Sequence, residues 1–305
     1  MFAPLSIAVL GEEPAGAALR SSALAAGLRL TDDQFGAAVV AIAHHDHRSR
    51  LASAVMSSGR VALLPPPICT TLGDADALVE ADRVRAGWVA YAEPILHAPL
   101  VARVLDDLPR LGAITHLEAR AISAASTEVW SADELVTLIA HPLALVTAIA
   151  NAAGHGRPCG VEARRDVDGL VEVRLRHSTG LVSSVVAGTG RDHEQHWDLQ
   201  VAGQVGVRRI ALLPQPQLEV DGDTVSLPPE IRDAPPEMRM GMTAMWTSLA
   251  ESRGATQPPV VGAQFGREIL QLLVAAGASI GDAQEIAVPW SGARDRSLSE
   301  FWRRP

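Results

Sequence analysis

The sequence of 305 residues contains no lysine, so all 26 residues of its combined lysine and arginine count are arginines. This absence excludes a lysine general acid, a lysine Schiff base and a lysine that holds nucleotide phosphates. Arginine cannot replace lysine as a proton donor, because its guanidinium stays charged at any working pH. Acid–base chemistry in this chain must therefore come from other side chains.

Cysteine and net positive charge are also scarce. The two cysteines, Cys69 and Cys159, lack metal-site spacing and predict reduced thiols in a cytoplasmic protein. The net charge is −9 and the arginines form no block, so we expect no nucleic-acid partner. The N-terminus lacks the features of a signal peptide. The long uncharged run Leu135–Ala153 contains His141 and Pro142, which favours a buried core helix over a membrane span.

The first 112 residues alternate short apolar runs with helical segments. This alternation predicts a parallel sheet with right-handed crossovers. The predicted strands are Ser6–Leu10, Ala37–Ala43, Val61–Leu64 and Trp88–Tyr91, and the predicted helices are Ala15–Ala26, Arg48–Ser58, Leu72–Glu80 and Pro99–Asp107.

After residue 112 the pattern becomes that of an antiparallel sheet backed by one long helix, Asp133–Ala153. Strands are predicted over Ile114–Ile122, Gly160–Arg165, Leu170–His177, Leu181–Val186, Asp198–Val201 and Val205–Leu213, a hairpin at Asp221-Gly222, and helices over Pro235–Ser252 and Gly262–Ala276. The expected fold class is α/β plus α+β. Residues 1–112 form a truncated Rossmann-like parallel sheet, and residues 113–305 form an α+β domain with a large, mostly antiparallel open sheet. The C-terminal segment is a candidate to pack back on the first domain.

Several stretches, taken in order, resemble one family of oxidoreductases. The first is Gly59–Leu78, which is similar to a Gly-Lys-His-Val-Leu-Cys-Glu-Lys-Pro segment of that family. Next come Tyr91–Val101 and Leu111–Ala121, which lie between the predicted domains. Asp133–Gly154 is similar to a helix with an Asp-x-x-x-His pair, and Arg294–Trp302 is similar to a pattern of actinobacterial members. Their order resembles that of the glucose–fructose oxidoreductase, inositol dehydrogenase and rhizopine-catabolism (Gfo/Idh/MocA) family. The resemblance implies hydride transfer between a nicotinamide and a carbinol carbon, with a lysine and the Asp/His pair handling the hydroxyl proton.

The residues at the matching positions predict that this proton transfer is impaired. The family's lysine position is Pro66, and the aspartate position is Thr137. The histidine is present as His141, so one of three proton-handling groups remains. Tyr91, the only tyrosine, and His97 lie near the predicted domain junction and are further candidates for the catalytic site, although packing is the more common role for a residue such as Tyr91.

The predicted cofactor turn is also incomplete. A dinucleotide-binding turn requires G-x-G-x-x-G, and here Gly11 and Gly16 fit the outer positions while Glu13 takes the central one. A Cβ and a carboxylate at that point oppose the approach of a diphosphate. Roughly 25–30 residues of a βα unit are missing before the strand Ala37–Ala43, judged from the usual size of such units. Asp32 or Asp33 could imitate the ribose carboxylate, but no strand is predicted before them.

The run from His44 to His47, which includes His45, follows a buried strand where the family has a loop over the nicotinamide. It is a candidate to line a degenerate cofactor cleft, and we expect no metal site there, because consecutive histidines do not converge on one ion. His116, Glu118 and Arg120 alternate on one strand face, which is either a solvated face or a substrate wall.

The sequence predicts a degenerate, pseudoenzyme-like member of this fold with no cofactor, which acts as a ligand-binding or partner subunit. The resemblance implies a homodimer through the open sheet and a small-molecule ligand between the domains. One alternative is an active NAD(P)-dependent oxidoreductase on a sugar, cyclitol or related hydroxyl compound, with His141 as its acid/base. A third is cofactor-independent elimination or isomerisation in the same cleft.

Overall fold

The computed structural model describes residues 5–11, 14–34, 36–43, 48–84, 87–124, 131–167, 169–190, 195–254 and 261–303. The chain forms two compact units. The first contains Met1–Pro94, Gly241–Leu270 and Ala293–Ser297, and the second contains Ile95–Met240, Gln271–Gly292 and Leu298–Pro305. The first stretch of unit 1 ends at residue 94, whereas the sequence places the division at residue 112.

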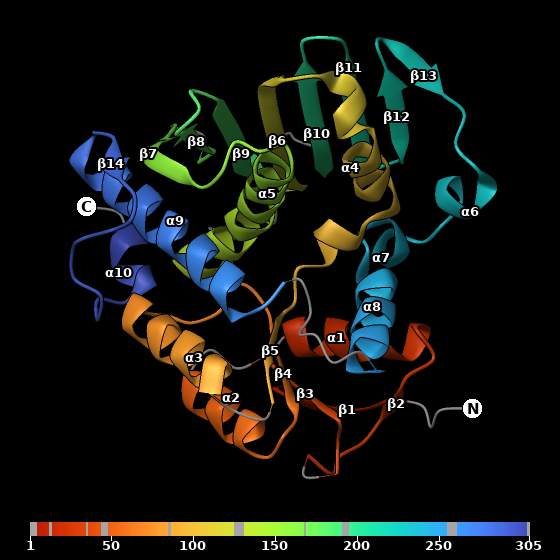
Figure 1. Ribbon diagram of the computed structural model, residues 1–305, viewed down its shortest axis with the longest axis vertical. Coiled ribbons are helices and arrows are strands. Elements are labelled where there is room, and N and C mark those ends of the chain that lie inside the picture. The colour runs from red at the N-terminus through yellow and green to blue at the C-terminus, as the bar shows by residue number, and fades with distance from the viewer. Residues whose placement is uncertain are drawn as a thin grey trace. The chain divides into compact units, whose positions relative to one another are not determined.

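Unit 1 is built on a five-stranded parallel sheet, sheet A, with the order β2-β1-β3-β4-β5 (Figure 1). Its strands are β1 (Ser6–Leu10), β2 (Arg29–Leu30), β3 (Val39–Ile42), β4 (Val61–Leu64) and β5 (Val89–Tyr91). Every residue of β3, β4 and β5 is buried, as expected of parallel strands that are covered on both faces. The helices of unit 1 are α1 (Pro14–Ala25), α2 (Arg48–Ser57), α3 (Leu72–Val84), α8 (Met242–Gly254) and the first part of α9 (Ala263–Asp282).

The two-residue strand β2 corrects the sequence analysis, which predicts no strand before Asp32. Ser6 and Ile7 of β1 pair in parallel with Arg29 and Leu30. The strand was missed because two residues show no periodicity. The chain then passes from β2 to β3 without a helix in the described residues of 31–38. The sequence predicted that a whole βα unit is missing before β3. Because the strand beside β1 is present, the missing part is smaller than predicted.

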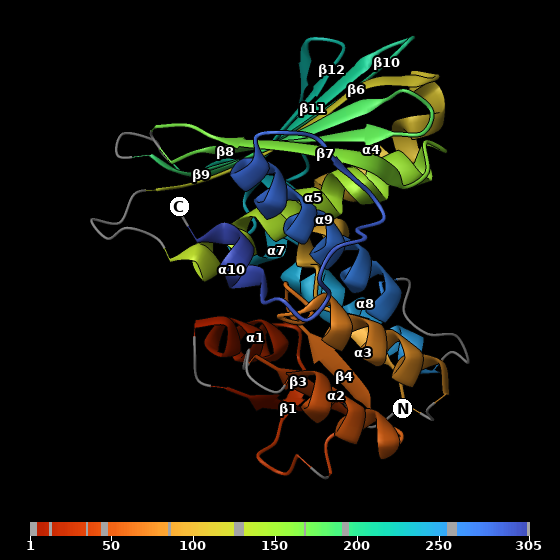
Figure 2. The ribbon, with the colours of Figure 1, turned by 90° about the vertical axis from the view of Figure 1, so that its left-hand side faces the viewer.

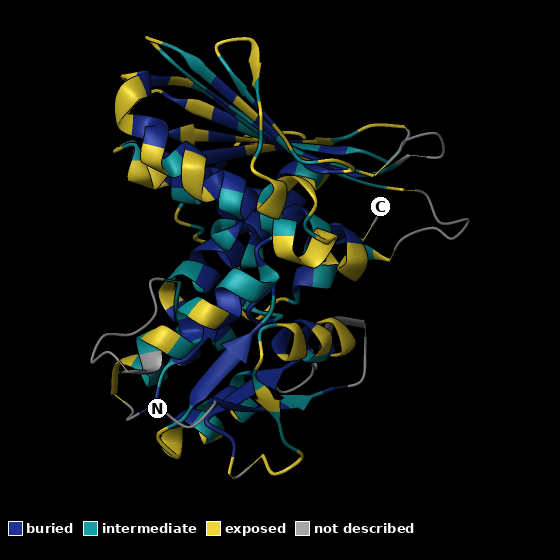
Figure 3. Ribbon diagram, turned by 90° about the vertical axis from the view of Figure 1, so that its right-hand side faces the viewer, coloured by how far each residue is buried: buried dark blue, intermediate teal, exposed yellow. Residues whose placement is uncertain are grey.

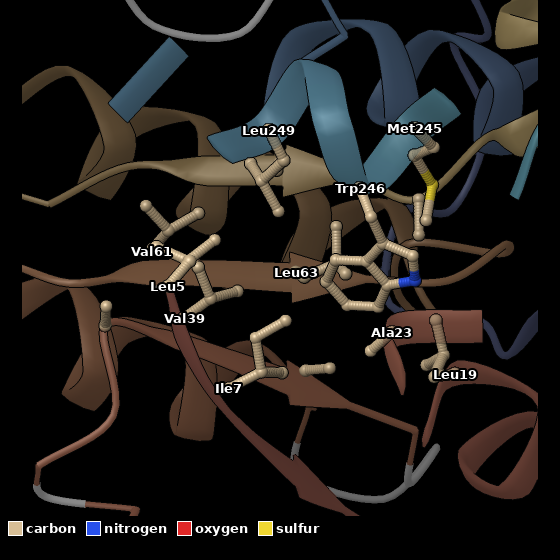
Figure 4. Packing of buried hydrophobic residues seen from close by; sticks show 14 residues of the cluster. Leu5, Ile7, Leu19, Ala23, Val39, Val61, Leu63, Met245, Trp246 and Leu249 are labelled. Carbon is tan, nitrogen blue, oxygen red and sulfur yellow. The ribbon is translucent and has the colours of Figure 1, made fainter. Parts of the chain in front are cut away.

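The core of unit 1 is closed by a helix that lies far from sheet A in sequence. Trp246 of α8 is fully buried among aliphatic side chains from α1 and from strands of sheet A, including Ala23 and Leu63 (Figure 4). Its indole Nε1 donates a hydrogen bond of 2.9 Å to Ser22 Oγ on α1. A helix was predicted over Pro235–Ser252, but the structure has two, α7 (Pro236–Arg239) and α8, separated at Gly241 with its positive φ of 84°.

Unit 2 is built on a nine-stranded sheet, sheet B, with the order β13-β12-β11-β10-β6-β9-β8-β7-β14. Its strands are β6 (Ile114–Ala124), β7 (Pro158–Arg165), β8 (Val171–His177), β9 (Val182–Gly190), β10 (His196–Gly203), β11 (Val207–Leu213), β12 (Gln217–Val220), β13 (Asp223–Val225) and β14 (Ile286–Ala287). The pair β6·β9 is parallel and the other pairs are antiparallel. The predicted fold class, a parallel sheet followed by a mostly antiparallel one, is confirmed.

One face of sheet B packs against helices. These include α4 (Pro99–Leu111) and α5 (Ala132–Ala152), and α5 packs on β6 and β9 (Figure 2). α5 begins with a capping box, in which Ser131 and Glu134 satisfy each other's backbone N–H groups. α5 is long and apolar enough to span a membrane, but 67% of its most apolar stretch is buried within the protein. It is a core helix, as the sequence predicts. The remaining short helices are η1 (Pro94–His97), α6 (Pro229–Arg232) and α10 (Leu298–Trp302).

Candidate functional site

In unit 1 the candidate site residues follow the carboxyl ends of the parallel strands, where α/β sheets bind ligands. β4 ends at Leu64, and the proline turn of residues 65–67 follows. The position that the family resemblance assigns to lysine, Pro66, lies in this turn and has no titratable group. The turn therefore cannot donate or accept a proton through the side chain at that position.

A buried guanidinium fixes the proline turn. Arg48, the first residue of α2, is 2% exposed, and its Nη1 donates to the carbonyls of Pro65, at 3.0 Å, and Pro67. Its Nη2 donates to the carbonyl of Ala43 at 2.9 Å. Arg48 thus ties the ends of β3 and β4 together. This role was not predicted from the sequence, because Arg48 and Arg50 both stand in the first turn of α2 and nothing in the sequence marks Arg48 as the buried one.

Tyr91, the last residue of β5, is buried in the same unit. Its ring packs edge-on against Phe265 of α9, with ring centroids 6.1 Å apart. No described residue forms a hydrogen bond with its hydroxyl group. Burial and the nearby Glu93 carboxylate raise the pKa of Tyr91 well above its usual value, although the Arg48 charge opposes them. The phenol is therefore neutral at physiological pH and does not act as a base in this arrangement.

The β1–α1 turn keeps two features of a dinucleotide-binding turn. Gly11 is buried with φ 112°, a conformation that favours glycine. A Cβ at Gly16 would collide with the carbonyl oxygen of Gly11, so the helix approaches the strand as closely as the motif requires. Arg20, one turn further along α1, donates to the same Gly11 oxygen at 2.8 Å. The central position, Glu13, lies outside the described residues.

Gly16→Ala is expected to destabilise the protein by about 1–3 kcal/mol, the usual effect of inserting a methyl group into a closely packed contact. Denaturant unfolding measures the change. Gly281→Ala is the matched control, because a Cβ at Gly281 in α9 meets no atom within 4 Å and alanine has the higher helix propensity. Equal stabilities of the two variants would contradict the predicted contact between Gly16 and Gly11.

The carboxylates that could hold a ribose directly follow β2. Asp32 and Asp33 are exposed, and the backbone N–H of Asp33 donates to Thr31 Oγ1 at 3.1 Å. Since β2 pairs with β1, these carboxylates follow the strand next to β1, the strand that leads into Gly11. This is the strand from which a dinucleotide-binding fold presents its acidic residue. The structure therefore supplies the strand that the sequence analysis had left out.

In unit 2, α5 carries the two positions that the resemblance assigns to an Asp/His pair. Thr137 and His141 are four residues apart and share one face of the helix. Thr137 Oγ1 donates to the Asp133 carbonyl of its own helix at 2.8 Å, and the side chain has no acid–base group. His141 is half-buried. The aspartate position therefore contributes no proton transfer, and His141 is the remaining group of the resembled pair.

His97, at the end of η1, is half-buried, and burial lowers its pKa below the usual value of 6.5. The unfolded chain therefore binds a proton near pH 6.5 that the folded chain binds only at lower pH, so stability falls as the pH decreases from about 6.5. His97→Gln is expected to make this slope shallower by up to about 1.4 kcal/mol per pH unit.

Urea unfolding at a series of pH values below neutrality measures the slope. His177→Gln is the comparison, because burial also lowers the pKa of His177, whose ring is bonded to Ser183 Oγ and the Gly156 carbonyl. An unchanged slope in the His97 variant would show that this imidazole titrates alike in the folded and unfolded chains.

The candidate residues are thus divided between the two units. Gly11, Gly16 and Tyr91 belong to unit 1, and His97 and His141 belong to unit 2. His44 and His45 lie outside the described residues. Within the described residues no group of three or more His, Cys, Asp or Glu side chains could hold a metal ion.

Comparison with known proteins supports the fold. GenD2 from gentamicin A biosynthesis, solved in complex with NAD, is 15% identical, with 95% of this chain and 98% of that chain covered and a TM-score of 0.75. UDP-N-acetylglucosamine 3-dehydrogenase GnnA from Acidithiobacillus ferrooxidans is 16% identical, with coverage of 92% and 99% and a TM-score of 0.73. Levoglucosan dehydrogenase in complex with NADH and L-sorbose is 16% identical, with coverage of 93% and 99% and a TM-score of 0.73.

No protein-family model and no curated protein matches the sequence. The structural similarities show the fold, and they confirm the predicted resemblance at that level. The chain has the two-unit fold of Gfo/Idh/MocA-type oxidoreductases.

Proposed function

We propose that this chain keeps an oxidoreductase fold without standard NAD(P)-dependent hydride transfer, and acts as a ligand-binding or partner subunit. The observation that carries the proposal is the proline turn after β4. Pro66 stands where the resembled enzymes have their lysine, and buried Arg48 binds the carbonyls on both sides of it. Arg48 keeps its charge at working pH, so it cannot take over the proton transfer.

The second supporting observation is the state of Thr137. Its hydroxyl bonds to its own helix backbone, which leaves His141 alone among the three proton-handling positions. A positioned general acid or base typically contributes about 10²–10⁴-fold to a rate. Loss of two such groups predicts a weak catalyst at best, and a binding role for the remaining residues.

A second candidate function is an active NAD(P)-dependent oxidoreductase on a sugar or cyclitol hydroxyl. It is favoured by the Gly11–Gly16 contact and by the carboxylates after β2, which fit the adenosine half of a dinucleotide. A bound nicotinamide would supply the hydride acceptor. Among this chain's residues, His141 would take the substrate's hydroxyl proton. The same histidine would serve in a cofactor-independent elimination or isomerisation.

Calorimetric titration with NAD⁺, NADH, NADP⁺ and NADPH tests the proposal. We expect no binding of any of the four in the micromolar range. Clear micromolar binding would contradict cofactor loss and favour the second candidate function. His141→Ala in the same protein separates the roles further, since an unchanged affinity for a bound ligand and an unchanged activity would remove His141 from the site.

Two further parts of the proposal concern partners and location. We propose a homodimer that forms through the face of sheet B left open by the helices, and a small-molecule ligand bound by the site residues. A cytoplasmic location follows from the reduced thiols expected at Cys69 and Cys159. Burial raises the pKa of Cys69 to about 12, so this thiol stays protonated and unreactive.

A further inference from the structure

The face of sheet B that lies opposite α5 carries polar side chains, because buried and more exposed residues alternate along its strands (Figure 3). On β6, Leu117, Ala119 and Ala121 are buried, whereas Glu118 and Arg120 point to the other side. No described helix of this unit covers that side of the sheet (Figure 2). We call it the open face.

The open face contains a groove of about 280 Å³ that crosses β6, β10, β11 and β12. Its charged lining residues are Glu118, Arg120, Asp198, Arg209 and Glu219. The groove therefore combines three carboxylates with two guanidiniums, which gives a net charge of −1. Pockets for drug-sized ligands usually span about 300–1,000 Å³, so this groove suits a smaller ligand, of about one sugar ring.

The groove lies where the register of β10 and β11 is irregular. Trp197 pairs with Leu213 but Asp198 pairs with Ala211, so Leu212 is an extra residue on β11. A bulge of this kind re-aims side chains and is common next to functional sites. The residue beside Asp198 on β11 is an alanine, and its short side chain leaves room next to the carboxylate.

Two hydrogen bonds hold the guanidiniums of the groove in place. Arg120 Nε donates to Glu118 Oε1 at 2.7 Å. Arg209 Nε donates to Gln200 Oε1 at 3.0 Å. These side chains are therefore positioned before a ligand arrives, which lowers the entropy cost of binding.

Asp198, on β10, differs from the other charged residues of the groove. Its carboxylate is half-buried and accepts no hydrogen bond from any residue that the structure describes. Burial raises the pKa of Asp198 and Glu118 adds to the rise, although Arg120 and His196 favour the charged form. A partly desolvated carboxylate without a donor is costly, and a cationic donor that reaches it offsets that cost.

The chemistry of the groove favours an organic cation over a metal ion. Among the described residues, no group of three or more His, Cys, Asp or Glu side chains could hold a metal. A primary ammonium carries one positive charge, which balances the net charge of the groove, and has three N–H donors for Asp198. The carboxylates, amides and guanidiniums around it offer both acceptors and donors to hydroxyl groups.

We propose that this groove binds a small hydroxylated primary amine, of about the size of one sugar ring, whose ammonium donates to Asp198. The site lies within unit 2 and uses none of the residues assigned to the candidate site above. It is therefore a second ligand site, and it does not depend on the loss of hydride transfer.

Ligand-observed NMR titration of the full chain with glucosamine tests the proposal. We expect a dissociation constant of about millimolar or below, which is usual for a ligand of this size. Glucose, which has the same ring but no ammonium, is expected to bind about tenfold more weakly or worse. The open face is also the face of the proposed homodimer, so the titration uses the chain in the oligomeric state that it adopts in solution.

Two variants separate the charge of the groove from its shape. Asp198→Asn keeps the shape of the side chain and removes its charge, so glucosamine should bind about tenfold more weakly while glucose is unaffected. Ala211→Leu fills the space beside Asp198 and should weaken the binding of both sugars. Asp106→Asn is the matched control, since Asp106 is exposed on α4, which packs on the other face. Thermal unfolding of each variant checks that it is folded.

Three results would overturn the proposed amine site. They are no binding of glucosamine, equal affinities for glucosamine and glucose, and a loss of glucosamine affinity in Asp198→Asn no larger than in Asp106→Asn. None of them bears on cofactor binding, which the calorimetric titration measures separately.

Discussion

Trp246→Ala is expected to lower the free energy of unfolding by about 3–5 kcal/mol, the usual cost of removing a buried tryptophan side chain. The indole is fully buried and packs among residues of α1 and sheet A (Figure 4). Its removal would leave a cavity between elements more than 150 residues apart in sequence, and the backbone there is held on both sides, so the site cannot collapse readily. The substitution also leaves Ser22 without the hydrogen bond from the indole.

Denaturant unfolding of three variants tests this account of the core. Trp246→Phe keeps a large aromatic ring but loses the bond to Ser22, so a smaller loss is expected than for alanine. Leu24→Ala on α1 is the control, because Leu24 is 58% exposed and a surface change is usually within about 0.5 kcal/mol. A loss below about 1 kcal/mol for Trp246→Ala would mean that α8 does not close this core.

Arg208→Met is expected to cost about 3 kcal/mol or more, because it leaves a buried carboxylate without its principal cation. Arg208 and Asp107 are each 8% exposed, and Arg208 Nε donates to Asp107 Oδ2 at 2.9 Å. The hydrogen bond from Arg208 holds the pKa of Asp107 below its usual value. The pair joins α4 to β11, so its loss also weakens the packing of α4 on sheet B.

The control for Arg208→Met is a substitution of a second arginine that pairs with the same Asp107 carboxylate. Arg110 also pairs with Asp107, at 2.8 Å, but its side chain is 78% exposed. Arg110→Met is therefore expected to cost no more than about 1 kcal/mol. Because the pKa of Asp107 is lowered in the folded chain, its contribution is present above pH ~4 and is lost as the pH falls further. Equal losses of unfolding free energy in the two arginine variants would contradict the claim that the buried ion pair is the stronger one.

The sequence predicted the fold class because strong periodic signals mark most elements. Apolar runs such as Val61–Leu64 and the alternation of Ile114–Ile122 are long enough to identify strands. β2 escaped because it has two residues, and the break at Gly241 escaped because an isolated glycine is tolerated in many helices. Both features depend on how neighbouring elements pack, which the local sequence does not encode.

The candidate site was predictable only in part, for a different reason. That Pro66 and Thr137 stand where the resemblance places a lysine and an aspartate is visible in the residues themselves. The role of Arg48 depends on carbonyls from two separate strand ends, and carbonyl positions leave no signature in a sequence. Long-range contacts between backbone and side chain therefore carry the information that the sequence alone does not.

The central claim is that this chain has lost NAD(P)-dependent hydride transfer, because Pro66 and Thr137 stand where the resembled enzymes have groups that handle the hydroxyl proton. Its most direct test measures nicotinamide reduction by the purified wild-type chain, supplied with NAD⁺ or NADP⁺ and a panel of sugars, cyclitols and other polyols. We predict no reduction above the rate without protein. Turnover that His141→Ala abolishes would contradict the claim and would establish the chain as an active oxidoreductase.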